Sequence, residues 1–214
     1  MALKVGITRF LGTNCDEDVR KWVDRLSMKP TYLWYEDQFN PDDYDMLIIP
    51  GGFSHGDYLR CGALAARTQV MKSVREFAKK DKPILGICNG FQILCESGLL
   101  PGALLQNKDM RFKDEWVNLK VENKNSFFGK KLELNQKLKL PIAHGDGNFY
   151  ADADSLKKMK DQNQIWLSYE SNPNGAIMNI AGITNEKHNI CALMPHPERA
   201  VASWMGSQDG IYFL

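Results

Sequence analysis

The segment PILGICNGFQ, residues 83–92, contains the strongest structural signal in this chain. Residues 84–87 form a short apolar run that is typical of a strand covered on both faces at the centre of a sheet. Cys88 follows this run and is flanked by Gly86 and Gly90, which is the spacing of a strand-to-helix turn that exposes a nucleophile. The segment therefore predicts a buried strand, a sharp turn that presents Cys88, and a helix that begins directly after it.

The chemistry of this turn favours a reactive thiol at Cys88. A nucleophile in such a turn has a strained backbone, and neighbours with a Cβ atom would collide there, which explains the two glycines. A thiol at a helix N-terminus also lies near the positive end of the helix dipole, which lowers its pKa. A free cysteine is more often a buried apolar side chain. The spacing of the glycines makes the nucleophile the better interpretation.

An imidazole and a carboxylate occur together much later in the chain, at His196 and Glu198. Pro195 and Pro197 fix two φ angles and prevent a helix, so we expect an extended segment. Residues two apart in such a segment point to the same side, which places Glu198 beside the His196 ring. Alone, this pattern is more typical of a surface turn. Combined with Cys88 it predicts a triad that acts on a carbonyl compound through a thioester.

A third segment, PGGFS at residues 50–54, is expected at the carboxyl end of another strand. Glycines at such a position can direct backbone N–H groups into a cleft without steric obstruction. The amides of Gly52 and of Asn89, just after the nucleophile, can form an oxyanion hole. The alternative is an ordinary turn that ends the strand.

Composition excludes several classes of protein. The chain has 214 residues, of which 43% are hydrophobic and 25% charged, and its net charge is +1. These values predict one α/β domain spanning residues 1–214, with no nucleic-acid partner and no membrane association. Five cysteines without a C-x-x-C pair, and no basic apolar leader, indicate the reducing cytoplasm. Metal-ligand spacing, the phosphate-binding G-x-x-x-x-G-K-[ST] and the dinucleotide-binding G-x-G-x-x-G patterns are absent from the sequence.

Short apolar runs alternate with amphipathic segments in the first half of the chain. This order predicts an α/β fold with a mostly parallel central sheet flanked by helices, whose site lies at the carboxyl ends of the strands. Alternating patterns in the second half predict added antiparallel strands. The expected strands are 3–8, 31–34, 45–49, 84–87, 116–121, 137–140, 175–183 and 190–194, and the expected helices before Cys88 are 14–27, capped by Asn14, and 62–80.

These motifs resemble the class I (triad) glutamine amidotransferases, which have a flavodoxin-like fold. The resemblance rests on the GICNGFQ turn at 86–92 and the His196-Pro197-Glu198 pair. Longer strings resemble, within that family, the glutaminase subunits of phosphoribosylformylglycinamidine (FGAM) synthases. These strings are residues 50–60, 98–104, 141–147, 194–199 and 206–213, so the resemblance spans nearly the whole chain.

The resemblance implies a role for each site residue in the hydrolysis of L-glutamine to glutamate and ammonia. Cys88 attacks the side-chain amide, His196 transfers the protons and Glu198 orients His196. The amides of Gly52 and Asn89 form the oxyanion hole, and Gln92 helps to hold the substrate's α-amino and carboxylate groups.

The resemblance also implies a division of labour between subunits. No cofactor is expected in this chain. A separate synthetase subunit uses the ammonia, with ATP and Mg, to convert formylglycinamide ribonucleotide to FGAM in purine biosynthesis. A small third subunit often takes part.

Departures from the family pattern and other functions remain open at the level of sequence. His55, Asp146 and Lys113 replace the more usual tyrosine, glutamate and cysteine, and the roles of these residues and of His144 are undetermined.

One alternative function is that of a glutaminase that serves another acceptor. Another is a thiol hydrolase of the DJ-1 and intracellular-peptidase type, in which a histidine tends to follow the nucleophile where this chain has Asn89. A third is a catalytically silent regulatory subunit.

Overall fold

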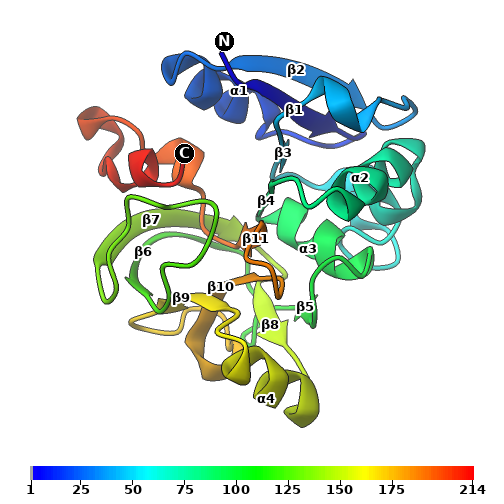
Figure 1. Cartoon of the computed structure of the whole chain (residues 1–214). Helices are drawn as coiled ribbons and strands as arrows, with labels where there is room; N and C mark the ends of the chain where they lie inside the picture. The colour runs from blue at the N-terminus through cyan, green and yellow to red at the C-terminus, as the bar shows by residue number, and fades with distance from the viewer. Residues whose placement is uncertain (1) are drawn as a thin grey trace.

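The structure, a computed structural model, describes residues 2–214 and is built around one large sheet (Figure 1). The sheet has nine strands in the order β2-β1-β3-β4-β11-β10-β9-β6-β7, so strands from both halves of the chain belong to it. A second sheet pairs β5 with β8. The strands are β1 (Lys4–Arg9), β2 (Lys29–Trp34), β3 (Met46–Ile49), β4 (Ile84–Ile87), β5 (Ala103–Leu105), β6 (Lys113–Val121), β7 (Lys137–His144), β8 (Asn148–Tyr150), β9 (Ile165–Tyr169), β10 (Ile180–Thr184) and β11 (Ile190–Leu193).

The large sheet has a parallel part and an antiparallel part. Strands β2, β1, β3, β4 and β11 run parallel to one another. From β11 onward, β10, β9, β6 and β7 each pair with their neighbours in antiparallel fashion. The predicted α/β class, with parallel strands and added antiparallel strands, is confirmed.

The pairing of β4 with β11 positions the site. These strands are parallel and in register, with Ile87 opposite Leu193. Their carboxyl ends therefore meet at the same edge of the sheet, and the segments that follow them leave it side by side. One segment begins with Cys88 and the other leads to His196, so sheet register brings together two residues far apart in the sequence.

The helices are α1 (Asp16–Arg25), α2 (Gln69–Lys79), α3 (Asn89–Glu96) and α4 (Ala153–Asp161). Helix α1 packs against β1 and β2, and α3 packs against β3, β4 and β11. The apolar faces predicted for the first two helices are buried, as Trp22 and Phe77 illustrate. Every residue of β3, β4 and β11 is also buried, so the site stands on the most enclosed strands of the sheet.

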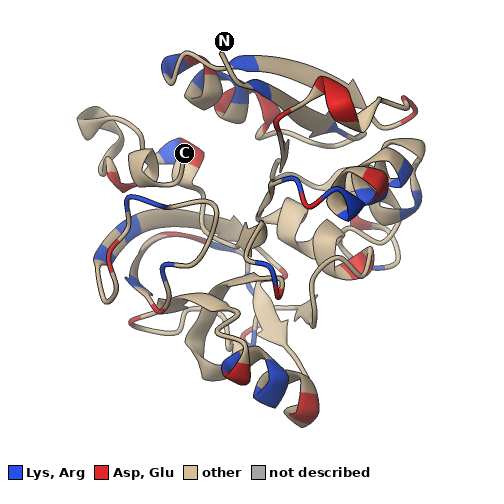
Figure 2. Ribbon diagram, viewed as in Figure 1, with Lys and Arg blue, Asp and Glu red and all other residues tan. Residues whose placement is uncertain are grey.

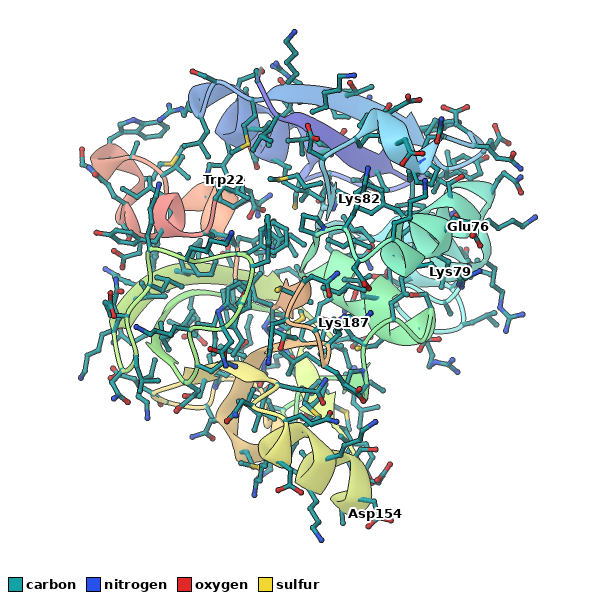
Figure 3. All side chains as sticks on the ribbon, in the orientation of Figure 1. Trp22, Glu76, Lys79, Lys82, Asp154 and Lys187 are labelled. Atoms are coloured by element: carbon teal, nitrogen blue, oxygen red, sulfur yellow. The ribbon has the colours of Figure 1, made fainter. Side chains whose placement is uncertain are left out.

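The opposite face of α2 is charged. Glu76 and Lys79 project outward from this helix, joined by an ion pair of 2.7 Å between Lys79 Nζ and Glu76 Oε1 (Figure 3). Basic and acidic residues are interspersed on α1, α2 and α4 (Figure 2). Within residues 2–214 no helix combines the length and the apolar character that crossing a membrane requires.

The helix expected over residues 62–80 begins only at Gln69. Residues 62–68 instead form turns and the short 3₁₀ helix Ala65–Arg67. Gly62 has a φ of +80°, and a Cβ atom on it would lie 2.8 Å from the backbone nitrogen of Ile93. This segment is therefore fixed by close packing against α3, which its sequence periodicity does not reveal.

Three other local expectations are corrected. The strand expected over 175–183 begins at Ile180, because a 3₁₀ turn with a left-handed Met178 precedes it. Cys15, not Asn14, is the N-cap of α1, and the Asn14 side-chain oxygen accepts a hydrogen bond from Cys15 Sγ at 3.2 Å. Strands β5, β8 and β9 were not expected. The lysine-rich run at 157–160 forms part of α4, and its Met159 is buried.

Candidate active site

Cys88 lies at the turn between β4 and α3, as the sequence predicts. Its φ of 50° and ψ of −105° place it in a region that non-glycine residues rarely occupy. Its amide donates a hydrogen bond of 2.8 Å to the carbonyl of Leu193 at the end of β11. Strained backbones of this kind persist only where the surrounding structure holds them, and they concentrate at functional sites.

The two flanking glycines are required by space. A Cβ atom on Gly90 would lie 2.0 Å from the carbonyl oxygen of Ile49 at the end of β3. A Cβ atom on Gly86 would lie 2.8 Å from the carbonyl oxygen of Gly90. Both contacts are shorter than packing allows, so the turn can form only with glycine at these positions.

His196 and Glu198 form a buried pair, although not in the extended conformation that was expected. Pro197 begins a 3₁₀ turn over Pro197–Arg199, because proline is well suited to the first position of such a turn. The turn still brings His196 Nδ1 within 2.6 Å of Glu198 Oε1, and both side chains are almost fully inaccessible. The amide of His196 donates to the carbonyl of Pro141 at 2.9 Å, which anchors the segment to β7.

The charge of Glu198 determines the protonation of His196. Burial lowers the pKa of His196, but the negative charge of Glu198, joined by that of Cys88 when the thiol is ionised, outweighs it and raises that pKa well above its ordinary value. The imidazole is therefore held as a cation whose second nitrogen, Nε2, has no hydrogen-bond partner. A cation here favours negative charge on a nearby thiol and can donate a proton to a leaving group.

Gly51 separates His196 from Cys88. A Cβ atom on Gly51 would lie 2.8 Å from His196 Cε1 and 3.3 Å from Cys88 Cβ, so both side chains border the same small space. The Cys88 thiol lies 3.7 Å from the carbonyl oxygen of Ala143, a distance at which a thiol can donate a weak hydrogen bond. Because catalytic contacts are often long before substrate binds, this arrangement is compatible with proton exchange between His196 and a substrate bound at Cys88.

The two residues predicted to supply the oxyanion hole both adjoin Cys88. Asn89 is the first residue of α3, so its N–H has no carbonyl one turn earlier to pair with. Gly52 forms a bridge with Thr13 in which the neighbouring Phe53 amide donates to the carbonyl of Gly12. Gly52 and Cys88 border the same cavity.

Gln92 lines this cavity, but part of its side chain is already engaged. Its oxygen accepts a hydrogen bond of 2.7 Å from Asn89 Nδ2, and its nitrogen donates one of 2.7 Å to the carbonyl of Asp146. Asn89 in turn accepts from the Ser54 amide at 3.2 Å. Gln92 therefore ties the turn at Cys88 to the loop after β7, which leaves one N–H for a ligand.

Two small cavities meet at Cys88. The first, of about 150 Å³, extends between Gln92 and the loop at 144–146. The second, of about 190 Å³, extends toward Cys15, His196 and Arg199. The thiol is thus accessible from two sides, one of which contains the imidazole.

Cys15 and Arg199 were not predicted as site residues. Arg199 Nη2 donates to Cys15 Sγ at 3.2 Å, and single potential ligand atoms of Cys15, His196 and Glu198 lie within 4.8 Å of one another. Glu198 Oε1 is already bonded to His196, and a cationic guanidinium beside Cys15 disfavours a metal ion. The absence of a metal site remains a prediction. No spacing in the sequence signals this cluster, which links residues at opposite ends of the chain.

The residues of undetermined role lie in different surroundings. His144 is buried, and its Nδ1 lies 3.0 Å from Asn107 Oδ1. Burial lowers the pKa of His144 to about 4, with a smaller effect of the His196 charge, so the ring is neutral. His55 has a left-handed backbone and lies edge-on to Tyr35, with ring centroids 5.3 Å apart. Lys113 forms an ion pair with Asp109.

Comparison with known proteins assigns the class. Residues 2–209 match the family of CobB/CobQ-like glutamine amidotransferase domains, and the chain belongs to this family. Its structure is similar to that of PurLQS from Thermotoga maritima, with 42% sequence identity and a TM-score of 0.91 over 99% of this chain and 95% of that one. It is also similar in fold to a glutamine amidotransferase from Thermotoga maritima, with 20% identity and a TM-score of 0.64 over 94% of this chain and 78% of that one.

Gly51→Ala tests the spacing between His196 and Cys88. The added methyl group must displace one of the two side chains, and misplacement of reacting groups by about 1 Å costs on the order of 100-fold in rate. We expect glutamine-dependent turnover to fall at least that far while the circular dichroism spectrum is unchanged. Turnover within about twofold of wild type would show that the two side chains do not need this spacing.

The neutral state of His144 predicts a pH dependence of stability. Its folded pKa of about 4 lies below its ordinary value of 6.5, so the unfolded state binds the proton first and stability falls as the pH drops through this interval. Comparing urea unfolding of wild type and His144→Asn between these pH values should show a steeper loss for wild type, by up to about 3 kcal/mol. Parallel curves would contradict a neutral His144.

Proposed function

We propose that this chain is the glutaminase subunit of an FGAM synthase, and that it hydrolyses L-glutamine to glutamate and ammonia for a synthetase subunit. The observation that carries the proposal is the pair of buried His196 and Glu198 beside the strained Cys88, in a chain 42% identical to PurLQS. The family supplies the reaction class, and the likeness over nearly the full length of both chains supports the particular enzyme.

The geometry supports a two-step reaction. Cys88 reacts as its thiolate beside the His196 cation: the sulfur attacks the amide carbon of glutamine, and the amides of Gly52 and Asn89 stabilise the negative oxygen. His196 donates the Nε2 proton to the leaving nitrogen, so ammonia departs and a thioester remains. His196 then removes a proton from a water molecule whose oxygen attacks the thioester, the Cys88 thiolate leaves, and the new carboxyl group loses its proton to solvent to give glutamate. Glu198 keeps the ring oriented and stabilises its positive charge in both steps.

An exposed apolar rim supports the docking of a synthetase over the site. Phe53 and Phe112 line both cavities, and their rings lie 6.3 Å apart. The side chains of Tyr58, Leu59 and Met110, in the same two loops, are 73–84% exposed. Large exposed apolar groups gathered around a cavity are typical of a protein interface. We assign this rim to the synthetase, which supplies ATP and Mg, with a small third subunit completing the complex.

The same proposal includes the domain organisation, the substrate and the cellular location of the chain. Residues 1–214 act as one domain, which agrees with strands of both halves joining the same sheet. L-Glutamine is the substrate of this subunit, and no cofactor is needed for the thiol chemistry described. The enzyme works in the cytoplasm, in keeping with five cysteine thiols that remain unpaired, Cys88 among them.

The Cys88→Ala variant distinguishes the glutaminase activity of this chain from the activity of the synthetase subunit. Without the thiol no thioester forms, so glutamine-dependent FGAM synthesis in the assembled enzyme should fall by more than about 1000-fold. Synthesis from added ammonium chloride should remain within about twofold of wild type, because the synthetase active site is untouched. Loss of both activities would show that Cys88 has a structural role and would contradict the proposal.

A further inference from the structure

The cavity between Cys88 and Gln92 has an acidic end. Asp57 and Asp146 both line it, and no lysine or arginine does. Across residues 2–214 neither carboxylate takes part in a salt bridge. We propose that Asp57, Asp146 and Nε2 of His144 bind the α-ammonium group of the amide substrate. This inference rests on the proposed glutaminase function and identifies the residues that select an α-amino acid.

The two carboxylates belong to one cluster. Cys61 Sγ donates a hydrogen bond of 2.9 Å to Asp146 Oδ2 and also lies close enough to Asp57 to affect its titration. Burial raises the pKa of Asp57, and the charge of Asp146 raises it further. Asp57 Oδ1 is buried without a hydrogen-bond partner. The charges of Asp57 and Asp146 repel each other. A bound cation would relieve this repulsion and supply the hydrogen bond that Asp57 Oδ1 lacks.

His144 provides an independent observation in the same cavity. Its side chain is 2% exposed, and its Nε2 has no partner. Asn107 Oδ1, which already accepts from the Gly147 amide at 3.0 Å, lies 3.0 Å from His144 Nδ1. Because an amide oxygen only accepts, Nδ1 carries the hydrogen and Nε2 is a bare acceptor. A primary ammonium has three N–H donors, and Asp57, Asp146 and His144, which all line this cavity, each carry an acceptor.

The two cavities at Cys88 differ in charge, which favours one of them for an ammonium group. The cavity on the other side of Cys88 contains Arg199, a permanent cation that repels an ammonium group. A glutamine whose side-chain amide reaches Cys88 can therefore place its α-ammonium group beside Asp57 and Asp146, while the remaining N–H of Gln92 can donate to its α-carboxylate. Asp57 has a left-handed φ of 57°, a conformation that Asp and Asn adopt more readily than most residues.

Asp57→Asn and Asp146→Asn test the assignment in the complex of this chain with its synthetase. The measurement is kcat/KM for L-glutamine and for glutaramate, which is glutamine without its α-amino group. Loss of a charged hydrogen bond should lower the value for glutamine by about 10- to 100-fold, mainly through KM. The value for glutaramate should stay within about twofold of wild type, as should both values in the exposed-surface control Asp43→Asn.

Stability distinguishes a ligand site from a structural one. Asparagine tolerates the left-handed backbone, and removing one of two neighbouring charges should leave the melting temperature unchanged or higher. A lower melting temperature with equal losses for both substrates would mean that the carboxylates are structural. Wild type supplies a test without any variant, because it should prefer glutamine to glutaramate by at least about tenfold.

Other outcomes would overturn the assignment in defined ways. Unchanged selectivity in both variants would reject the ammonium subsite while leaving the glutaminase proposal intact. Glutaminase activity that is lost with a chelator and restored by a divalent cation, measured without ATP, would assign the acidic end to a metal ion instead. If wild type in the complex neither hydrolyses glutamine nor requires Cys88, the proposed function itself fails.

Discussion

Cys88 is held with a φ of 50° between the last residue of β4 and the first of α3, and the rest of the site depends on this conformation. Such a backbone is costly, and several contacts maintain it. The Cys88 amide is bonded to Leu193 on the adjacent strand, and Gly90 packs directly against the carbonyl of Ile49. Because β4 lies between β3 and β11 in the buried centre of the sheet, this turn cannot relax without disturbing the core.

The sheet also explains how acid–base chemistry reaches the thiol. Strand β11 returns the chain to the parallel part of the sheet, and the segment after it brings His196 and Glu198 to the end of β4. The burial of this pair has two consequences. It prevents water from weakening their ion pair, and it leaves His196 Nε2 available for the reacting groups. The acidic end of the cavity then separates substrate recognition by Asp57 and Asp146 from proton transfer by His196.

Much of the active-site arrangement can be predicted from the sequence, because the residue patterns that indicate it are local. The glycine spacing around Cys88 and the short separation of His196 and Glu198 report directly on backbone geometry. The contacts that sequence reasoning missed join distant segments, as when Cys15 meets Arg199 or when Asp57 approaches the loop after β7. The helix expected from residue 62 failed for a related reason, since its first residues are shaped by tertiary packing against α3. The local periodicity of apolar residues does not indicate such tertiary packing.

The most direct test of the account is covalent labelling of the assembled enzyme with 6-diazo-5-oxo-L-norleucine, a diazoketone analogue of glutamine, followed by peptide mapping with mass spectrometry. The buried thiol of Cys15, which lies beside the same imidazole, provides an internal comparison. We expect one adduct, on Cys88, that excess L-glutamine prevents. An adduct on Cys15 in place of Cys88, or no adduct on this chain in the presence of its synthetase, would contradict the assignment of Cys88 as the nucleophile.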